Sequence, residues 1–168
     1  MDPFKKIILI IISICCLVGC DASSKYIAKK ELKNQFGLSY LNGSIQLIYA
    51  ENSGGMLSFG HELSGEFKYL IFQIFVSIMV VLLFLFLIIK KDLKKLQAVS
   101  LLLFLSGGLS NLIDRITNGG RVIDFMVVNL GSFHTGIFNI ADIYITAGVI
   151  LLIISSFIRN GRQLKETI

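Results

Sequence analysis

The chain has 168 residues, a formal net charge of +5, an apolar content of 54% and a mean hydropathy of +0.76. This composition is too apolar for an ordinary soluble domain, and the length allows one compact unit. The basic residues lie at the ends of apolar runs and form no basic face with interleaved aromatics, which argues against a nucleic-acid-binding protein.

Four apolar segments follow one another, each with charged residues at an end. A spanning helix needs roughly 20 residues. The first segment reaches that length only by continuing past Cys20, which requires Asp21 and Lys25 to face protein. We predict an all-α membrane protein that forms a single integral domain over residues 1–168, with a small extracytoplasmic β-rich surface domain. The predicted spans are about 4–28, 67–89, 96–113 and 137–158.

Lysine and arginine residues gather beside particular ends of these segments. Cytoplasmic loops carry an excess of such residues close to the spans. Four spans then place both termini and the loop between the second and third spans in the cytoplasm, although four lysines between residues 25 and 33 would lie outside. The clusters are Lys5 and Lys6; Lys90, Lys91, Lys94 and Lys95; and Arg159, Arg162 and Lys165.

Two segments, about 29–66 and 114–136, are left outside the membrane. The first contains a strand-like run at 44–49 and then a glycine-rich stretch at 52–55. The second contains a glycine turn followed by 121–128, which is too short and too charged to span. We expect this last piece to be extended or half-helical and to return to the membrane surface.

The cysteines, Cys15, Cys16 and Cys20, all lie in the first apolar run. An odd number in one helix does not make a disulfide framework, so we interpret them as small apolar packing residues. Residues 17–20 also match the end of a bacterial lipoprotein signal peptide, which would make Cys20 a lipidated N-terminus. Because three further spans follow, we expect the first helix to be retained.

Two aspartates accompany the last span. Asp142 lies five residues into the apolar run that begins at Ile137, and Asp124 precedes that run in the sequence Val-Ile-Asp-Phe. Ionisable groups in a span are costly and are therefore candidates for function. Two carboxylates held close together can share one proton, which is the working state of an aspartic protease.

Other polar residues follow helical spacing. Asn139, Asp142 and Thr146 fall at i, i+3 and i+7, which would place them on one helical face. Small residues let helices approach closely in lipid, so packing alone explains the serines and glycines but not a buried carboxylate. A second stripe, in the third span, consists of Gly107, Asn111 and Arg115.

Alternative chemistries fit the sequence less well. His61 and His134 are isolated, so no zinc motif exists, and no glycine-rich phosphate loop follows a strand. A small transporter or ion relay would also use an intramembrane Asp with Asn and Arg, but four short spans with one outer domain and no repeat argue against it. A non-catalytic assembly factor that uses the stripes only for packing is the third class. Replacement of the aspartates distinguishes the three.

Five short motifs stand in a recognisable order. They are Asp21 with Lys25; Asn52-Ser53-Gly54 followed by Ser58-Phe59; the stretch 106–115, which ends in Asn-Leu-Ile-Asp-Arg; Val122-Ile123-Asp124-Phe125; and Phe138-Asn139-Ile140-Ala141-Asp142. With these motifs the chain resembles the lipoprotein signal peptidases, the type II signal peptidases of bacterial inner membranes, over nearly its whole length. It departs from the family's usual pattern at Ala22, Ser106, Ser110 and Ile143, positions that concern helix packing.

The resemblance implies an aspartic endopeptidase that cuts diacylglyceryl-modified prolipoproteins just before the lipidated Cys. It assigns catalysis to Asp124 and Asp142, and it implies no metal and no organic cofactor. We expect a monomer in the bacterial inner membrane, with membrane lipid and the prolipoprotein as its partners. The implied substrate-binding residues are Asn52, Gly54, Asn111, Arg115 and Asn139, and the implied structural supports are Asp21, Lys25, Gly107 and Asp114.

Overall fold

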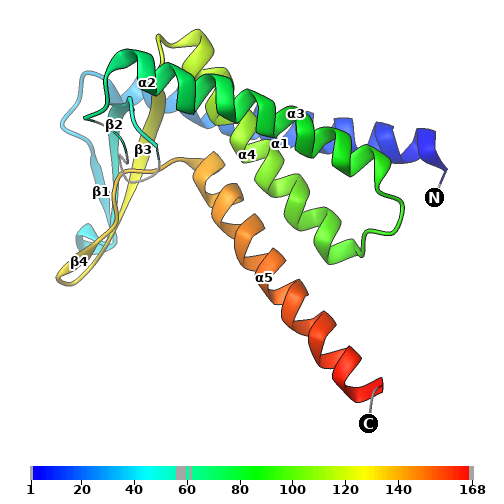
Figure 1. The fold of residues 1–168 in the computed structure, drawn as a ribbon. Helices are drawn as coiled ribbons and strands as arrows, with labels where there is room; N and C mark the ends of the chain where they lie inside the picture. The colour runs from blue at the N-terminus through cyan, green and yellow to red at the C-terminus, as the bar shows by residue number, and fades with distance from the viewer. Residues whose placement is uncertain (1, 56–59, 61, 167–168) are drawn as a thin grey trace.

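The computed structural model describes residues 2–55, 60 and 62–166 (Figure 1). Within them lie four helical segments long and apolar enough to cross a membrane, which confirms the predicted four-span architecture. The second of these segments is continuous but contains a π-helical stretch between two α-helical parts. The segments are α1 (Pro3–Leu32); α2 (Gly65–Tyr69) with η3 (Leu70–Phe75) and α3 (Val76–Ile89); α4 (Lys95–Thr117); and α5 (Ile140–Glu166).

A four-stranded antiparallel sheet makes up the remainder of the ordered structure, in the order β1-β2-β3-β4. The central pair joins the segment between the first and second spans to the segment between the third and fourth: Ala50 of β2 lies opposite Asp124 of β3, and Asn52 lies opposite Val122. The strand-like run at 44–49 therefore does form a strand, and the piece at 121–128 is extended rather than helical. The elements are β1 (Leu38–Tyr40), the 3-10 turn η1 (Leu41–Gly43), β2 (Ile45–Asn52), β3 (Val122–Leu130) and β4 (Phe133–His134).

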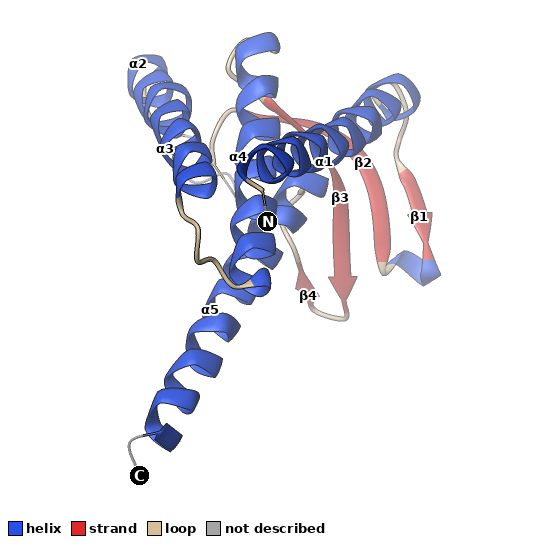
Figure 2. Ribbon diagram, turned by 90° about the vertical axis from the view of Figure 1, so that its right-hand side faces the viewer, coloured by secondary structure: helices blue, strands red, loops and turns tan. Residues whose placement is uncertain are grey.

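The sheet packs against the C-terminal part of α1 (Figure 2). Ala28 and Leu32 on the helix and Phe125 on β3 form one buried apolar cluster there. A second cluster, built around Ile10, Leu87 and Leu105, holds α1, α3 and α4 together further along the helices. The first of these clusters holds the C-terminal end of α1 directly beside the central strands.

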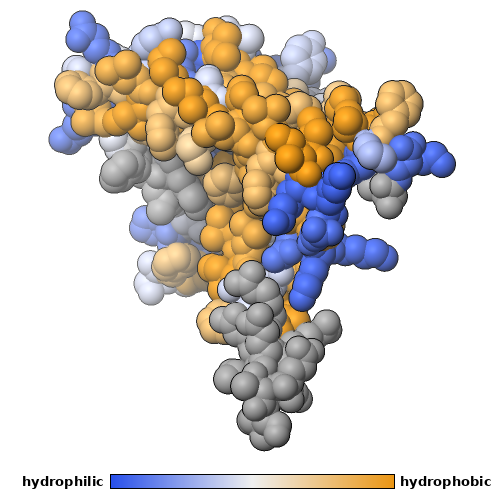
Figure 3. All heavy atoms as spheres, turned by 45° about the vertical axis from the view of Figure 1, so that its right-hand side comes forward, coloured by the Kyte–Doolittle hydropathy of each residue, from blue (hydrophilic) through white to orange (hydrophobic). Residues whose placement is uncertain are grey.

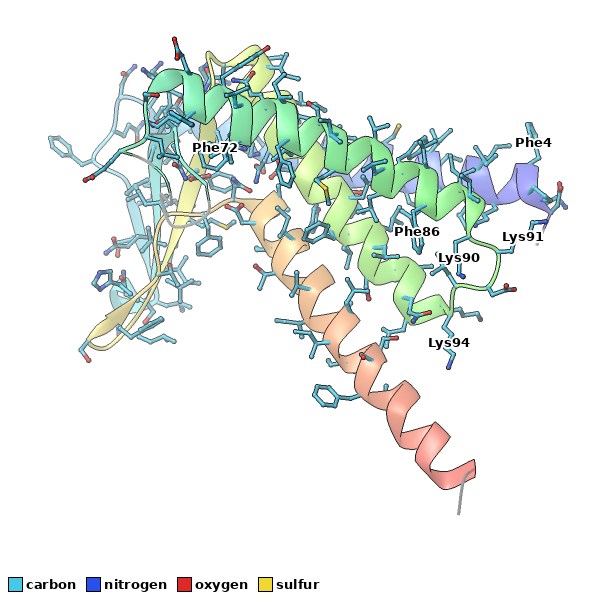
Figure 4. The ribbon with its side chains drawn as sticks, in the orientation of Figure 1. Phe4, Phe72, Phe86, Lys90, Lys91 and Lys94 are labelled. Carbon is cyan, nitrogen blue, oxygen red and sulfur yellow. The ribbon has the colours of Figure 1, made fainter. Side chains whose placement is uncertain are left out.

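The opposite end of the molecule carries the N-terminus and the α3–α4 loop. The Lys6 ammonium donates hydrogen bonds to the carbonyl oxygens of Ile88, at 3.1 Å, and Lys90, at 2.7 Å, and so binds unpaired carbonyls at the end of α3. Figure 4 shows Phe4 and Lys90 at this end, whereas Phe72 lies at the end beside the sheet. Figure 3 shows a broad apolar surface over the helices, with a cluster of hydrophilic residues at its border.

Helices α4 and α5 approach each other closely, and glycines permit this contact. A Cβ atom added at Gly148 would lie 2.7 Å from the carbonyl oxygen of Ser100 and 2.9 Å from the backbone nitrogen of Phe104. A Cβ atom at Gly107 would overlap the carbonyl oxygen of Ala141 and lie 3.2 Å from the backbone nitrogen of Ile145. Small residues at such positions let two backbones approach in lipid.

Replacing Gly107 by Ala should therefore push α4 and α5 apart. Overpacking of this kind costs about 1–3 kcal/mol of unfolding free energy, so we expect the thermal midpoint in detergent to fall by several degrees. Gly19→Ala is the matched control, because no atom lies within 4 Å of a Cβ at that helical position. Equal midpoints for the Gly107 variant and the wild type would show that the two helices do not depend on this contact.

Candidate active site

Asp142 lies in the first turn of α5, and Asn139 immediately precedes that helix. The Asn139 side-chain oxygen accepts a hydrogen bond from the Asp142 backbone nitrogen at 2.9 Å, and the Asp142 carboxylate accepts one from the Asn139 backbone nitrogen at 3.1 Å. This reciprocal pair is a capping box. The prediction that Asn139, Asp142 and Thr146 share one helical face is therefore wrong at Asn139, because the apolar run from Ile137 begins as a loop and the helix begins at Ile140.

The start of the helix at Ile140 changes the expected depth of Asp142. A carboxylate at residue three of a helix sits at the helix end, near the sheet, rather than in the middle of a span. The positive end of the helix dipole and the free N–H groups of the first turn favour a negative charge there. Asp142 can therefore ionise at a lower energetic cost than an aspartate in the centre of the apolar run.

Asp124 lies in β3 and is 3% exposed. Its two carboxylate oxygens accept hydrogen bonds from the amide nitrogens of Asn52, at 3.0 Å, and Asn139, at 2.6 Å. Burial raises the pKa of Asp124 to about 6; the hydrogen bond from Asn52 lowers the pKa in part, and the charge of Asp142 raises it. Asp124 therefore holds or releases a proton close to neutral pH.

This raised pKa predicts how stability changes with pH. An unfolded Asp titrates near 4, so between about pH 4 and pH 6 the native state binds more protons than the unfolded state, and stability falls as pH rises through that window. Asp124→Asn removes this titration, which is worth up to about 3 kcal/mol. The variant's midpoint relative to wild type should therefore be higher at pH 7.5 than at pH 4.5.

Thermal unfolding at the two pH values checks this expectation. The matched control is Asp92→Asn, which changes an exposed aspartate in the α3–α4 loop. A difference between the Asp124 variant and wild type that stays constant with pH would contradict the raised pKa.

The two aspartates share amide partners. Asn139 donates to Asp124 through its side chain and to Asp142 through its backbone, so one residue bonds to both carboxylates. Asn111 of α4 donates from its side-chain nitrogen to Asp142 at 3.0 Å. Its side-chain oxygen accepts from the Asn139 amide at 3.3 Å. The sheet, α4 and the start of α5 thus meet at one polar centre.

A mostly buried charged cluster adjoins this centre through the Lys25–Asn111 hydrogen bond. Lys25 of α1 forms ion pairs with Asp21 at 2.6 Å and with Asp114 of α4 at 2.9 Å. Ser110 donates to Asp21 at 2.6 Å, which ties α4 to α1 a second time. Asp21 and Lys25 therefore face protein, as the length of the first span requires, and they pair both with each other and across helices.

Arg115 spans the gap between α4 and the loop after β2. Its guanidinium donates to the carbonyl oxygen of Gly54 at 2.7 Å and to that of Asn111 at 3.3 Å. Asn52 shapes the loop, because its side chain accepts from the Gly54 nitrogen at 2.8 Å and donates to the Gly55 carbonyl at 3.0 Å. The predicted residues of the second motif thus stand between Asp124 and Arg115. Ser58 and Phe59, quoted with that motif, lie outside the described residues.

Phe72 is a member of the site that no sequence pattern predicted. Its ring lies 5.2 Å from the Arg115 guanidinium carbon, within cation–π range. Phe72 belongs to the π-helical stretch η3, and such local insertions often occur at functional sites. The signal was weak, because Phe72 is one of many apolar residues in a nearly uniform run.

A further polar network lies where β2 and β3 meet the end of α1. Glu51 accepts hydrogen bonds from the Tyr49 hydroxyl at 2.6 Å and from Arg121 at 3.0 Å. Both bonds lower the pKa of Glu51, and the bond from Tyr49 has the larger effect. Burial raises the pKa of Tyr49, and the hydrogen bond to Glu51 raises it further. The network braces the strand pair that carries Asn52 and Asp124.

Metal chemistry has no ready ligand set in the described part of the chain. Among the side chains that the structure describes, in residues 2–55, 60 and 62–158, no group of three or more His, Cys, Asp or Glu is placed to hold a metal ion. What the site does contain is one buried and one partly buried carboxylate, Asp124 and Asp142, with shared amide donors. Such a pair can share a proton and activate water.

The comparisons with known proteins agree with this chemistry. Residues 12–158 match the family model described as signal peptidase (SPase) II. A lipoprotein signal peptidase of Borrelia hermsii is 32% identical over 164 residues, which cover 95% of each chain. A lipoprotein signal peptidase of Helicobacter pylori is 31% identical over 162 residues, which cover 96% of this chain and 94% of the other.

Solved structures are similar as well. A bacterial membrane enzyme determined at 2.3 Å resolution by the in meso method superposes with a TM-score of 0.78 at 28% identity, covering 92% of this chain and 90% of the other. A second bacterial membrane enzyme, at 1.9 Å, gives a TM-score of 0.72 at 29% identity and covers 88% of this chain and 91% of the other. The chain therefore belongs to the signal peptidase II family, a family of membrane-bound aspartic proteases.

Proposed function

We propose that Asp124 and Asp142 are the catalytic pair with which this family member hydrolyses the peptide bond just before the lipidated Cys of a diacylglyceryl prolipoprotein. Removal of the signal peptide from prolipoproteins is the activity of the family, and membership covers most of the chain. The single observation that carries the assignment of the pair is that Asn139, immediately before α5, bonds to both carboxylates.

The pair works as an acid and a base. Like charges held close together cannot both ionise cheaply, so the two carboxyl groups share one proton near neutral pH. The ionised member takes a proton from water as that water attacks the scissile carbonyl carbon. The protonated member donates to the carbonyl oxygen, and a proton then passes to the leaving amine as the C–N bond breaks. One water is consumed, and two peptides are released.

Neighbouring residues hold the pair and the substrate. Asn52 and Asn111 each donate to one carboxylate, which limits its rotation. Arg115 orders the loop at Gly54, and the Asn52 side chain, which donates to Asp124 and to the Gly55 carbonyl, holds this loop beside Asp124, where a peptide can lie against it. Gly107 lets α5 approach α4 closely enough for Asn111 to reach Asp142.

Cleavage of a purified diacylglyceryl prolipoprotein in detergent tests this function. We expect a signal peptide and a product that begins with the lipidated Cys, identified by mass. The same protein without the diacylglyceryl group is the substrate control. No cleavage of the lipidated form by folded enzyme would overturn the proposal, and transport activity without cleavage would favour an ion relay.

We further propose that the site faces away from the cytoplasm in a chain that acts as a single monomeric unit, with both termini cytoplasmic. The Lys6 contacts with Ile88 and Lys90 support a common side for the N-terminus and the α3–α4 loop. The α4–α5 contact brings Gly148 beside Ser100 and Ala141 beside Gly107, so α5 runs back toward the same side.

Reporter fusions should show this topology. A reporter inserted at Asp92, in the exposed α3–α4 loop, should give a cytoplasmic signal, and one inserted at Gly43, in the exposed turn η1, should give an external signal. Basic residues near the spans cause the expected orientation, so moving the four lysines of the loop elsewhere should weaken it. A cytoplasmic signal from residue 43 would place the site on the wrong side of the membrane for processing of exported lipoproteins.

A further inference from the structure

The ammonium group of Lys25 is saturated by three different acceptors. It lies 2.6 Å from a carboxylate oxygen of Asp21, 2.9 Å from one of Asp114 and 2.9 Å from the side-chain oxygen of Asn111. The Lys25 side chain is 2% exposed. An ammonium has three donors and no acceptor, so each proton has one partner and the direction of the group is fixed.

This contact determines which way the Asn111 amide points. The atom that faces Lys25 must be the amide oxygen, because an ammonium can only donate. The other end of the amide is then the NH₂ group, which donates to Asp142 at 3.0 Å. Asn139 reinforces the same orientation, because its NH₂ group donates to the same Asn111 oxygen at 3.3 Å. If the Asn111 amide rotated by half a turn, its oxygen would face the carboxylate of Asp142 and its NH₂ group would face two donors.

The two carboxylates that bind Lys25 also reach the backbone beside the catalytic pair. The second oxygen of Asp21 accepts from the backbone nitrogen of Ala141 at 2.8 Å, one residue before the aspartate of α5. The Asp114 oxygen that binds Lys25 also accepts from the backbone nitrogen of Ile123 at 3.3 Å, one residue before the aspartate of β3. A single carboxylate therefore links Lys25 to the backbone next to Asp142, through Asp21, and another links it to the backbone next to Asp124, through Asp114.

We propose that Lys25 is a positioning residue for the hydrolysis, which sets the orientation of the Asn111 amide toward Asp142 and anchors the backbone on which both catalytic aspartates stand. The proposal rests on the assignment of Asp124 and Asp142 as the catalytic pair. Among the described contacts, Lys25 has none with the catalytic carboxylates of Asp124 and Asp142. It acts on them through Asn111, Asp21 and Asp114.

A purely structural role is the competing explanation. A buried ion pair is often no more stabilising than well-packed apolar residues of similar volume, so the cluster is weak support for a stabilising role by itself. Removing the cation alone leaves Asp21 and Asp114 uncompensated and risks misfolding. The Lys25 change is therefore made in an Asp114→Asn background, where Lys25→Met leaves only Asp21 charged, so the doubly substituted cluster has the same net charge of −1 as the unaltered one.

The experiment is a double-mutant cycle between Lys25 and Asn111 in the Asp114→Asn background, read as kcat for a diacylglyceryl prolipopeptide. Adding Lys25→Met should lower kcat by about 10-fold or more with KM changed by less than about threefold, because a misplaced donor affects the chemical step. When Asn111 is already Ala, adding Lys25→Met should lower kcat by less than about threefold, because the residue it orients is gone.

Two results would overturn the proposal. If Lys25→Met lowers kcat by the same factor with and without the Asn111 side chain, or does not lower it at all, the proposal is overturned. Lys25→Arg in the otherwise unaltered protein is the second variant: it keeps the charge, but a planar guanidinium cannot reproduce three diverging bonds, so kcat should again fall by about 10-fold while the thermal midpoint changes little. Wild-type kcat in that variant would also overturn the proposal.

Two further variants complete the design. Lys30→Met, which removes an exposed lysine of the same helix, should leave kcat unchanged. Asp124→Asn separates this inference from the proposed function: if it is inactive while the Lys25 variants are normal, only the positioning role fails, whereas an active Asp124→Asn enzyme would remove the assumption on which both stand.

Discussion

Replacing either Asp124 or Asp142 by Asn is expected to lower kcat for prolipoprotein cleavage by about a thousandfold or more. Asn has nearly the same shape as Asp, but it can neither accept the proton of the attacking water nor share a proton with its partner. Each variant should still insert and fold, because the amide can keep part of the hydrogen bonding to Asn139 and, at position 142, the helix cap. Single-turnover cleavage with a lipidated peptide measures the loss.

The double variant should be hardly less active than either single one, since the two carboxylates act as a unit and effects within such a unit are not additive. Asp92→Asn, in the exposed α3–α4 loop, is the control for loss of an acidic residue and should retain wild-type kcat. If either single variant turned over at a near-wild-type rate, the aspartic mechanism at this pair would be wrong.

Arg115→Lys is expected to lower kcat/KM by about 10- to 100-fold although the charge is retained. The guanidinium bonds at once to the Gly54 and Asn111 carbonyls, and its central carbon lies over the Phe72 ring, 5.2 Å from the ring centroid. A lysine ammonium is a compact point charge that cannot hold this forked geometry over the ring. The Gly54 loop should then lose its fixed position beside Asp124, which weakens substrate binding as well as the chemical step.

Steady-state kinetics with the same peptide measure the effect on kcat and KM separately. Arg121→Lys is the matched control: it makes the same substitution at a largely exposed arginine, 57% exposed, which pairs with Glu51 outside the site. Equal kcat/KM for Arg115→Lys and wild type would mean that only the charge matters at this position.

The amino-acid sequence by itself determined the architecture of the membrane part. An apolar stretch of about 20 residues has few alternatives to a spanning helix, because backbone groups in lipid must bond within their own segment. The four segments therefore coincide with helices, and Asp21 and Lys25 face protein as the length of the first span demanded. Motif order also identified the residues that the fold brings together, since Asn52, Asn111, Asp124, Asn139 and Asp142 join in one hydrogen-bonded network.

Only the tertiary structure decided how those residues work together. Hydropathy does not show where a helix begins, because the apolar run from Ile137 starts before the helix does. The capping box of Asn139 and Asp142, and the position of Asp142 at a helix end, could therefore not be predicted from the run. Sequence spacing cannot show contacts between distant segments, and for that reason the contact of Phe72 with Arg115 was not foreseen. The three acceptors of Lys25 lie on two helices, and the charge balance among them exists only once α1 and α4 pack.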